Sequence, residues 1–268
     1  MKTQIKQQIN RLVTDFGSKL GYKIYRHHSL PKGVDLALDI GKRLNRQPVK
    51  VIFDVGANIG QTAAEFSQKF PEAQIHSFEP VADIFQDLQR NTRGLDRVRC
   101  YDFGLGNSSG TANIYLQEKS VWNSIVTDKQ SEGNLLTKPL QKVEEIELQT
   151  VDFFACNNGI EHIDLLKTDT EGYDLEVIKG AAKYLQENRI SFVLSEVGFY
   201  KRDRGHTYFP DIHDYLDSQG FQLVDLYGIT PAINLHNRFG FANALFVNSQ
   251  IAEQWCRWED NKWKTGYK

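Results

Sequence analysis

The stretch from Val51 to Gly60 places the strongest constraint on the fold of this 268-residue chain. It begins with the apolar run Val51–Phe53, which is typical of a buried parallel strand, and it ends in the pattern Asp-x-Gly-x-Asn-x-Gly. Residues 61–66 then have the character of a helix start. A strand, a glycine turn and a helix in this order place a nucleotide-like ligand at the end of the strand, against free helix N–H groups.

The glycine spacing indicates which ligand this is. The NAD fingerprint has a middle glycine that lets the backbone approach a pyrophosphate, whereas here Asn58 stands between Gly56 and Gly60. The spacing therefore favours a ligand without a pyrophosphate, such as S-adenosylmethionine (SAM). We expect Asp54 to act on its ammonium group, directly or through water, and backbone N–H groups to receive its carboxylate. Gly56 should permit a tight turn close to the ligand, and Gly60 should let the helix lie against the strand.

Two further strand ends predict contacts with the nucleoside. The segment 74–80 is the next expected strand and carries Glu79 near its end. A carboxylate at this position accepts hydrogen bonds from ribose hydroxyls, in NAD enzymes as well as in SAM enzymes. A third expected strand, 98–103, ends in Asp102 and Phe103. Either residue could contact adenine, by a hydrogen bond or by edge packing.

Three acidic side chains follow the ends of two later strands. The expected strands 163–169 and 190–196 place Asp169, Glu171 and Glu196 at the edge where open α/β sheets bind ligands. These carboxylates are candidate catalytic groups, and Asp169 is also a candidate cofactor contact. Hard oxygen ligands of this kind suit Mg²⁺ as well, so the sequence leaves both a protein base and a metal-assisted route open. Helix capping and salt bridges are the structural alternative.

The segment 198–210 is a basic loop that follows the last of these strands. It carries Lys201, Arg202 and His206 and has no apolar periodicity. We expect it to be mobile without ligand and to shield the site when substrate is bound. His206 is a fourth candidate catalytic residue, because the pKa of imidazole lies near neutrality. A solvated loop is the alternative.

Composition limits the possible partners. The net charge of −2 gives no reason to expect nucleic acid, and three widely spaced cysteines make a zinc site or disulfide framework unexpected. No metal site is predicted. No run of 18 apolar residues occurs, so membrane insertion is not expected. The cysteine usage and the lack of a signal-peptide pattern predict a cytoplasmic protein.

Three blocks of the sequence resemble the FkbM-type SAM-dependent methyltransferases in order and spacing. The blocks are residues 53–60, 78–80 and 166–181. The first two are shared by many class I methyltransferases, while the third, Leu-Lys-Thr-Asp-Thr-Glu-Gly-Tyr-Asp and its continuation, is the specific one. The resemblance covers roughly Val51 to Val247.

This resemblance implies both a fold and a reaction. The implied fold is Rossmann-like α/β, with a seven-stranded, mostly parallel sheet in the order 3-2-1-4-5-7-6, strand 7 antiparallel, and helices on both faces. The implied reaction is methyl transfer from SAM to a hydroxyl oxygen of a small molecule, sugar or glycan. Two alternatives remain: an NAD-dependent oxidoreductase, which the missing middle glycine disfavours, and a non-catalytic SAM-binding or scaffold protein.

Segments outside the resemblance complete the predicted organisation. We expect an N-terminal helical segment over 1–46, a SAM-dependent methyltransferase domain over 47–250 and a tail over 251–268. Apolar residues at helical spacing predict an amphipathic helix from Lys2 to Leu20. This helix could cover the catalytic domain, join two copies of the chain as a homo-oligomer or, least favoured, lie on a membrane.

Overall fold

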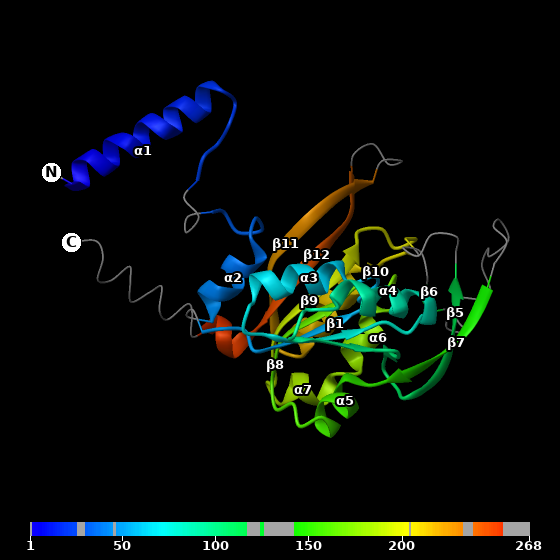
Figure 1. Ribbon diagram of the computed structural model, residues 1–268. Helices are drawn as coiled ribbons and strands as arrows, with labels where there is room; N and C mark the ends of the chain where they lie inside the picture. Colours follow the sequence, from blue (N-terminus) through cyan, green and yellow to red (C-terminus); the bar gives the residue numbers. More distant parts are fainter. Residues whose placement is uncertain are drawn as a thin grey trace.

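The computed structural model describes residues 2–25, 30–44, 47–116, 124–125, 142–203, 205–232 and 238–253. Two sheets organise this part of the chain, a large central sheet and a smaller one at one end of it (Figure 1). The predicted tail from 254 onward lies outside the described residues.

The central sheet has the predicted strand order. It runs β11-β12-β9-β8-β1-β2-β3, with neighbours parallel from β3 to β9, and β12 antiparallel to both β9 and β11. When these seven strands are numbered 1 to 7 along the chain and the order is read from β3, it is 3-2-1-4-5-7-6 with strand 7 antiparallel. The prediction is therefore confirmed. The short strand β10 (Thr207–Tyr208) pairs with the end of β9. The seven strands are β1 (Val51–Val55), β2 (Gln74–Phe78), β3 (Val98–Tyr101), β8 (Ile163–Thr168), β9 (Ile190–Gly198), β11 (Phe221–Ala232) and β12 (Arg238–Asn248).

Helices cover both faces of this sheet, which explains why its central strands are apolar on both sides. Ile52 and Leu165 belong to a core cluster with α2 and α3, whereas Phe53 and Leu166 belong to a second cluster with α5, α6, α7 and α8. The helices are α2 (Leu36–Arg43), α3 (Gln61–Lys69), α4 (Ala82–Thr92), α5 (Val151–Asn157), α6 (Asp174–Lys179), α7 (Ala182–Gln186) and α8 (Phe209–Ser218).

The apolar pattern of residues 174–187 predicts one helix, but the structure divides it into α6 and α7. A Cβ at Gly180 would lie 2.0 Å from the backbone oxygen of Gly106, so the chain passes close to another segment there. The side chain of Asp152 then accepts hydrogen bonds from the N–H groups of Lys183 and Tyr184 in the first turn of α7. A tertiary contact and a cap from α5 therefore end one helix and begin the next.

The smaller sheet runs β4-β7-β5-β6. Strands β5 and β7 are antiparallel. Strand β7 leads directly into α5, which Thr150 caps through a hydrogen bond from the N–H of Phe153. The strands are β4 (Gly104–Leu105), β5 (Gly110–Leu116), β6 (Ser124–Ile125) and β7 (Lys142–Gln149).

Helix α1 (Lys2–Lys19) lies apart from the sheets (Figure 1). The apolar side chains of Leu12, Phe16 and Leu20 are exposed. Among the described residues, no helix has the length and apolar character needed to cross a membrane. Helix α2, by contrast, packs into the core next to β11, although the predicted division at 46 and 47 separates it from the catalytic domain. That division stays a prediction.

Candidate active site

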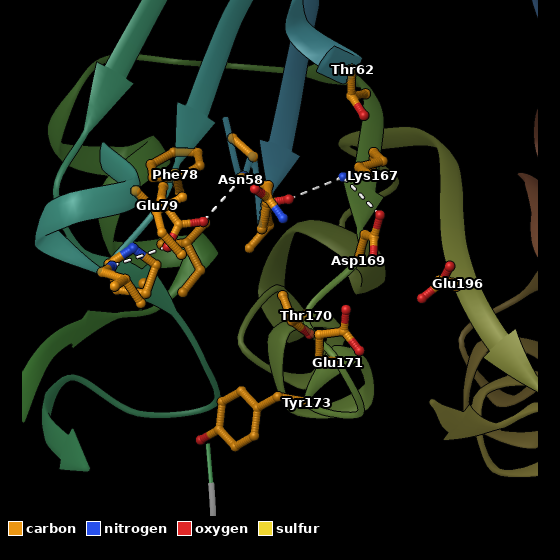
Figure 2. A pocket seen from close by; sticks show the side chains of 18 of the residues that line it. Asn58, Thr62, Phe78, Glu79, Lys167, Asp169, Thr170, Glu171, Tyr173 and Glu196 are labelled. Carbon is orange, nitrogen blue, oxygen red and sulfur yellow. Dashed lines mark hydrogen bonds and ion pairs between the residues drawn. The ribbon is translucent and has the colours of Figure 1, made fainter. Parts of the chain in front are cut away.

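A cavity of about 520 Å³ opens where β1, β2, β8 and β9 end (Figure 2). This volume is in the range of ligand sites. It lies at the carboxyl edge of the parallel strands, where the sequence predicts ligand binding. Seven predicted site residues line it: Gly56, Asn58, Glu79, Asp169, Glu171, Glu196 and His206.

The glycine turn after β1 lies close against two other segments of the chain. Gly56 has a positive φ of 74°, and a Cβ there would lie only 1.9 Å from the backbone oxygen of Asp169. Gly60 has φ 93° at the start of α3, and a Cβ there would lie 3.0 Å from Thr92 and 3.1 Å from Leu88 of α4. The close neighbour of Gly60 is therefore helix α4 and not the strand that we expected.

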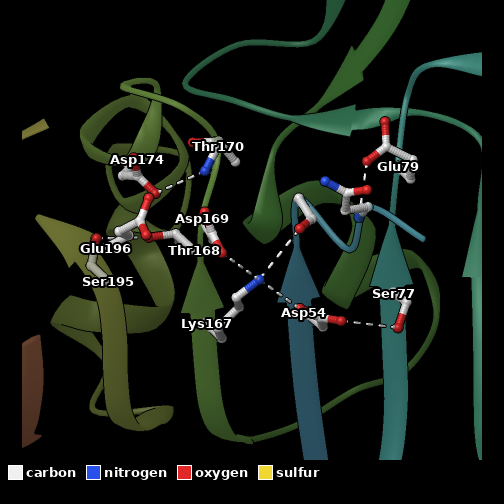
Figure 3. A network of polar contacts seen from close by, with 12 residues as sticks. Asp54, Ser77, Glu79, Lys167, Thr168, Asp169, Thr170, Asp174, Ser195 and Glu196 are labelled. Atoms are coloured by element: carbon white, nitrogen blue, oxygen red, sulfur yellow. Dashed lines mark hydrogen bonds and ion pairs between the residues drawn. The ribbon is translucent and has the colours of Figure 1, made fainter. Parts of the chain in front are cut away.

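Asp54 is fully buried and does not line the cavity. Its carboxylate lies 3.0 Å from the ammonium nitrogen of Lys167, which is also 3.3 Å from the backbone oxygen of Gly56 and 3.5 Å from Asp169 (Figure 3). Burial lowers the pKa of Lys167, but the two carboxylates more than offset this and hold the pKa above its usual value. Lys167 was not predicted as a site residue. Its signal was a lysine directly after the apolar pair Leu165 and Leu166 in a central strand.

Glu79 occupies the opposite end of the cavity (Figure 2). One carboxylate oxygen accepts a hydrogen bond from the N–H of Asn58 and the other from the N–H of Val81, each at 3.0 Å. Burial raises the pKa of Glu79 to about 7, against the effect of these two bonds. Each oxygen has a further lone pair, so the carboxylate can also accept ribose hydroxyls.

The structure places the two predicted adenine contacts outside the cavity lining. Asp102 is exposed, and Phe103 packs against an aromatic cluster, with its ring centroid 5.7 Å from that of Phe78. Their contact with adenine stays a prediction. The lining next to Glu79 is instead apolar and includes Val81 and Ile84, which pattern reasoning did not single out.

The three predicted acids converge on the other end of the cavity. Burial, together with repulsion from Asp169 and Asp174, raises the pKa of Glu171 to about 8. The same three causes raise the pKa of Glu196 to about 9. Both side chains therefore hold a proton at neutral pH. Within the described part of the chain, no group of three or more His, Cys, Asp or Glu side chains is arranged to hold a metal ion.

His206 joins this acidic end from the loop after β9. Its Nδ1 lies 2.8 Å from Asp203, its Nε2 lies 3.5 Å from Glu196, and its ring stacks on Phe241 at 4.4 Å. The parallel pairing of β10 with β9 fixes the end of this loop beside the cavity. Asp203 was not predicted, because its contact depends on the loop conformation.

The lining fits SAM chemically. Glu79 offers acceptors for ribose hydroxyls, and the carboxylate of Asp169 at the other end suits a cationic ligand. Thr170 also lines the cavity, and its buried hydroxyl has no hydrogen-bond partner among the described residues.

A sheet of this topology, with a glycine turn after the first strand and an acid after the second, defines a class I SAM-dependent methyltransferase. The chain belongs to the Methyltransferase FkbM domain family, whose model matches residues 54–223. Its cofactor is therefore SAM, and the NAD-dependent alternative is not favoured.

Two relatives and one solved structure are similar to this chain. The 2-O-methyltransferase NoeI of Sinorhizobium fredii is 27% identical over 188 residues, which are 68% of this chain and 76% of NoeI. The hexuronic acid methyltransferase AglP of Haloferax volcanii is 30% identical over 148 residues, 55% of each chain. The solved METTL16 MTase domain, at 11% identity and a TM-score of 0.45, covers 78% of this chain and 65% of that chain.

Proposed function

We propose that this chain transfers the methyl group of SAM to a hydroxyl oxygen of a carbohydrate. The names of NoeI and AglP, one a 2-O-methyltransferase and the other a hexuronic acid methyltransferase, support a sugar acceptor. The cavity supports oxygen as the accepting atom, because a histidine, which can take up a hydroxyl proton, lines it.

The observation that carries the proposal is the placement of His206. It lines the cavity, one ring nitrogen is bonded to Asp203, and the other faces Glu196 at the acidic end. A neutral imidazole in such an arrangement can accept a proton from an alcohol as the alcohol oxygen attacks.

The other residues have binding and orienting roles in this proposal. Bound SAM supplies a methyl group that is already activated by the positive sulfur. Glu79 holds the ribose, and the buried Asp54–Lys167 pair fixes the turn that faces the cofactor. Glu171 and Glu196, protonated at neutral pH, can each donate one hydrogen bond and accept others, which suits the mixed donors and acceptors of a sugar. Asp169 lies between the residues proposed to bind the cofactor and those proposed to bind the sugar.

The test is methyl transfer to a panel of mono- and oligosaccharides, with the product mapped by mass spectrometry and NMR. We expect an O-methyl ether. His206→Asn should lower kcat by roughly 10²–10⁴-fold, with the SAM dissociation constant changed much less. His213→Asn is the matched control, since His213 also bonds an aspartate but is exposed on α8 outside the cavity.

Three outcomes would contradict the proposal: no methylation of any sugar, transfer to nitrogen or carbon, or full turnover by His206→Asn. Adding a chelator to the same assay separates the two routes to hydroxyl activation, a protein base and a bound metal ion. Indifference to chelator favours His206, whereas loss of activity that Mg²⁺ restores favours a metal held by Asp169, Glu171 or Glu196.

A further inference from the structure

The carboxylate of Asp203 closes a turn around His206. One oxygen accepts a hydrogen bond from the N–H of Gly205 at 3.0 Å, and the other lies 2.8 Å from Nδ1 of His206. The N–H of Asp203 in turn donates to the backbone oxygen of Tyr200 at 2.9 Å. The carboxylate is therefore held from both sides, and it meets the imidazole in a defined direction.

The surrounding strands leave this pair little freedom. A Cβ added to Gly198, the last residue of β9, would lie 3.0 Å from the Asp203 carboxylate and 3.0 Å from Cβ of His206. On the other side, the His206 ring stacks nearly parallel to Phe241 of β12, with 14° between the planes. The ends of two strands thus fix the position of the dyad, and the absence of a side chain at Gly198 makes room for it.

The contact determines which nitrogen of His206 carries the hydrogen. A carboxylate only accepts hydrogen bonds, so Nδ1 must donate, and Nε2 remains the unprotonated nitrogen of the neutral ring. Nε2 is also the atom that faces Glu196 and the cavity.

We propose that Asp203 is a positioning residue that fixes the tautomer and orientation of His206, so that Nε2 receives the acceptor proton. This inference rests on the proposed function. As the hydroxyl oxygen bonds to the methyl carbon, the carbon–sulfur electron pair returns to sulfur and the hydroxyl proton moves to Nε2. The resulting imidazolium is stabilised by Asp203 and later releases the proton to solvent, and the product is an ether with no charge left on it.

The groups that face His206 come from four elements. They are Asp203 on its own loop, Glu196 on β9, Asp169 and Glu171 after β8, and the uncharged ring of Phe241 on β12. Of these, only Asp203 contacts Nδ1. Removing it changes the Nδ1 side of the ring while the cavity side keeps its partners.

Asp203→Asn tests this directly. The two residues have the same shape, but the amide can present an N–H to Nδ1 and so favour the opposite tautomer. We expect nitrogen-15 NMR of histidine-labelled protein to show hydrogen on Nδ1 of His206 in the wild type and on Nε2 in the variant. We expect kcat to fall by roughly 10²–10⁴-fold, with KM and the SAM dissociation constant within about threefold. The control Asp214→Asn removes the partner of His213, and it should change neither the His206 tautomer nor kcat.

The NMR and kinetic results separate failure of this inference from failure of the proposed function. A wild-type tautomer with hydrogen on Nε2, or an unchanged tautomer in Asp203→Asn, would overturn the role of Asp203. A switched tautomer with undiminished turnover would instead overturn the role of His206 as base. If Asp203→Asn does not fold, Asp203→Glu serves in its place. Because it keeps a carboxylate, it should retain the Nδ1–H tautomer and more activity than Asp203→Ala, and a loss equal to that of Asp203→Ala would overturn the proposal.

Discussion

At the scale of single residues, Lys167 connects the two turns that form the cavity. Its ammonium group lies between the carboxylates of Asp54 and Asp169 and close to the backbone oxygen of Gly56. Lys167 and Asp54 are buried almost completely. A buried charge that loses its partner is costly, because neither water nor another cation replaces it.

We therefore expect Lys167→Met to lower the free energy of unfolding by about 3–5 kcal/mol. Urea denaturation followed by circular dichroism measures this. The control is Lys69→Met, which removes a partly exposed pair with Glu65 and should cost less than about 1 kcal/mol. Combining Lys167→Met with Asp54→Asn should recover part of the loss. A double variant no more stable than Lys167→Met would contradict the ion-pair explanation.

Glu196 makes the stability of the folded chain depend on pH. Its pKa of about 9 in the folded chain lies above its ordinary value of 4.5, so between these values the folded chain holds a proton that the unfolded chain has released. Stability must then fall as the pH rises through this interval. Glu196→Gln removes the ionisation, and we expect the variant to gain stability relative to wild type as the pH rises from 5 to 9. Parallel denaturation curves at the two pH values check this, and a difference that does not change with pH would contradict it.

Sequence patterns predicted the acidic residues of the cavity lining because strand ends converge at one edge of a parallel sheet. Glu79, Asp169 and Glu196 lie there for that reason. Asp203 was missed because its contact with His206 arises from the fold of one loop, which no periodic pattern encodes. The adenine contacts expected from Asp102 and Phe103 rested on position alone, and the chain turns after β3 so that neither residue lines the cavity.

At the scale of elements, strands were predicted better than helix ends. Apolar runs predicted the central strands at 51–55 and 190–196, since burial on both faces leaves a strong signal. The break between α6 and α7 depends on Gly106 and on Asp152, which are distant in sequence, so the apolar pattern through 174–187 could not reveal it.

The end of the loop after β9 is anchored, because residues 207–208 pair with β9. Residues 199–203 and 205–206 belong to no strand or helix, and within them Asp203 and His206 are held by the turn at Gly205 and by stacking on Phe241. We expect amide hydrogens in 199–206 to exchange rapidly without ligand and more slowly with the demethylated cofactor and a sugar acceptor bound. Hydrogen exchange followed by mass spectrometry measures this. Equal exchange in both states across 199–206, with residues of β9 as the internal reference, would contradict a closing loop.

At the scale of the whole molecule, helix α1 lies apart from the sheets, and apolar side chains on it and just after it are exposed. They include Leu12, Phe16 and Leu20 at helical spacing, and exposed apolar patches of this kind mark contact surfaces. We expect the full chain to self-associate through α1. Light scattering after size exclusion should give a mass above the 30.7 kDa of one chain, and Leu12→Glu with Phe16→Glu should return it to one chain. The control is Arg11→Glu with Asp15→Lys, also on α1. A monomeric wild-type chain would contradict the expectation.

Because a Cβ at Gly56 would collide with the backbone of Asp169, the turns after β1 and β8 cannot be lengthened or exchanged one at a time. An engineer who grafts a new segment into either turn must rebuild the other to match. The loop after β9 borders the same cavity through His206, and the atoms nearest to a Cβ at Gly198 belong to the side chains of Asp203 and His206 and not to backbone. New acceptor preferences are therefore best sought by diversifying that loop around a retained Asp203–His206 pair. The turns after β1 and β8 should then be left unchanged.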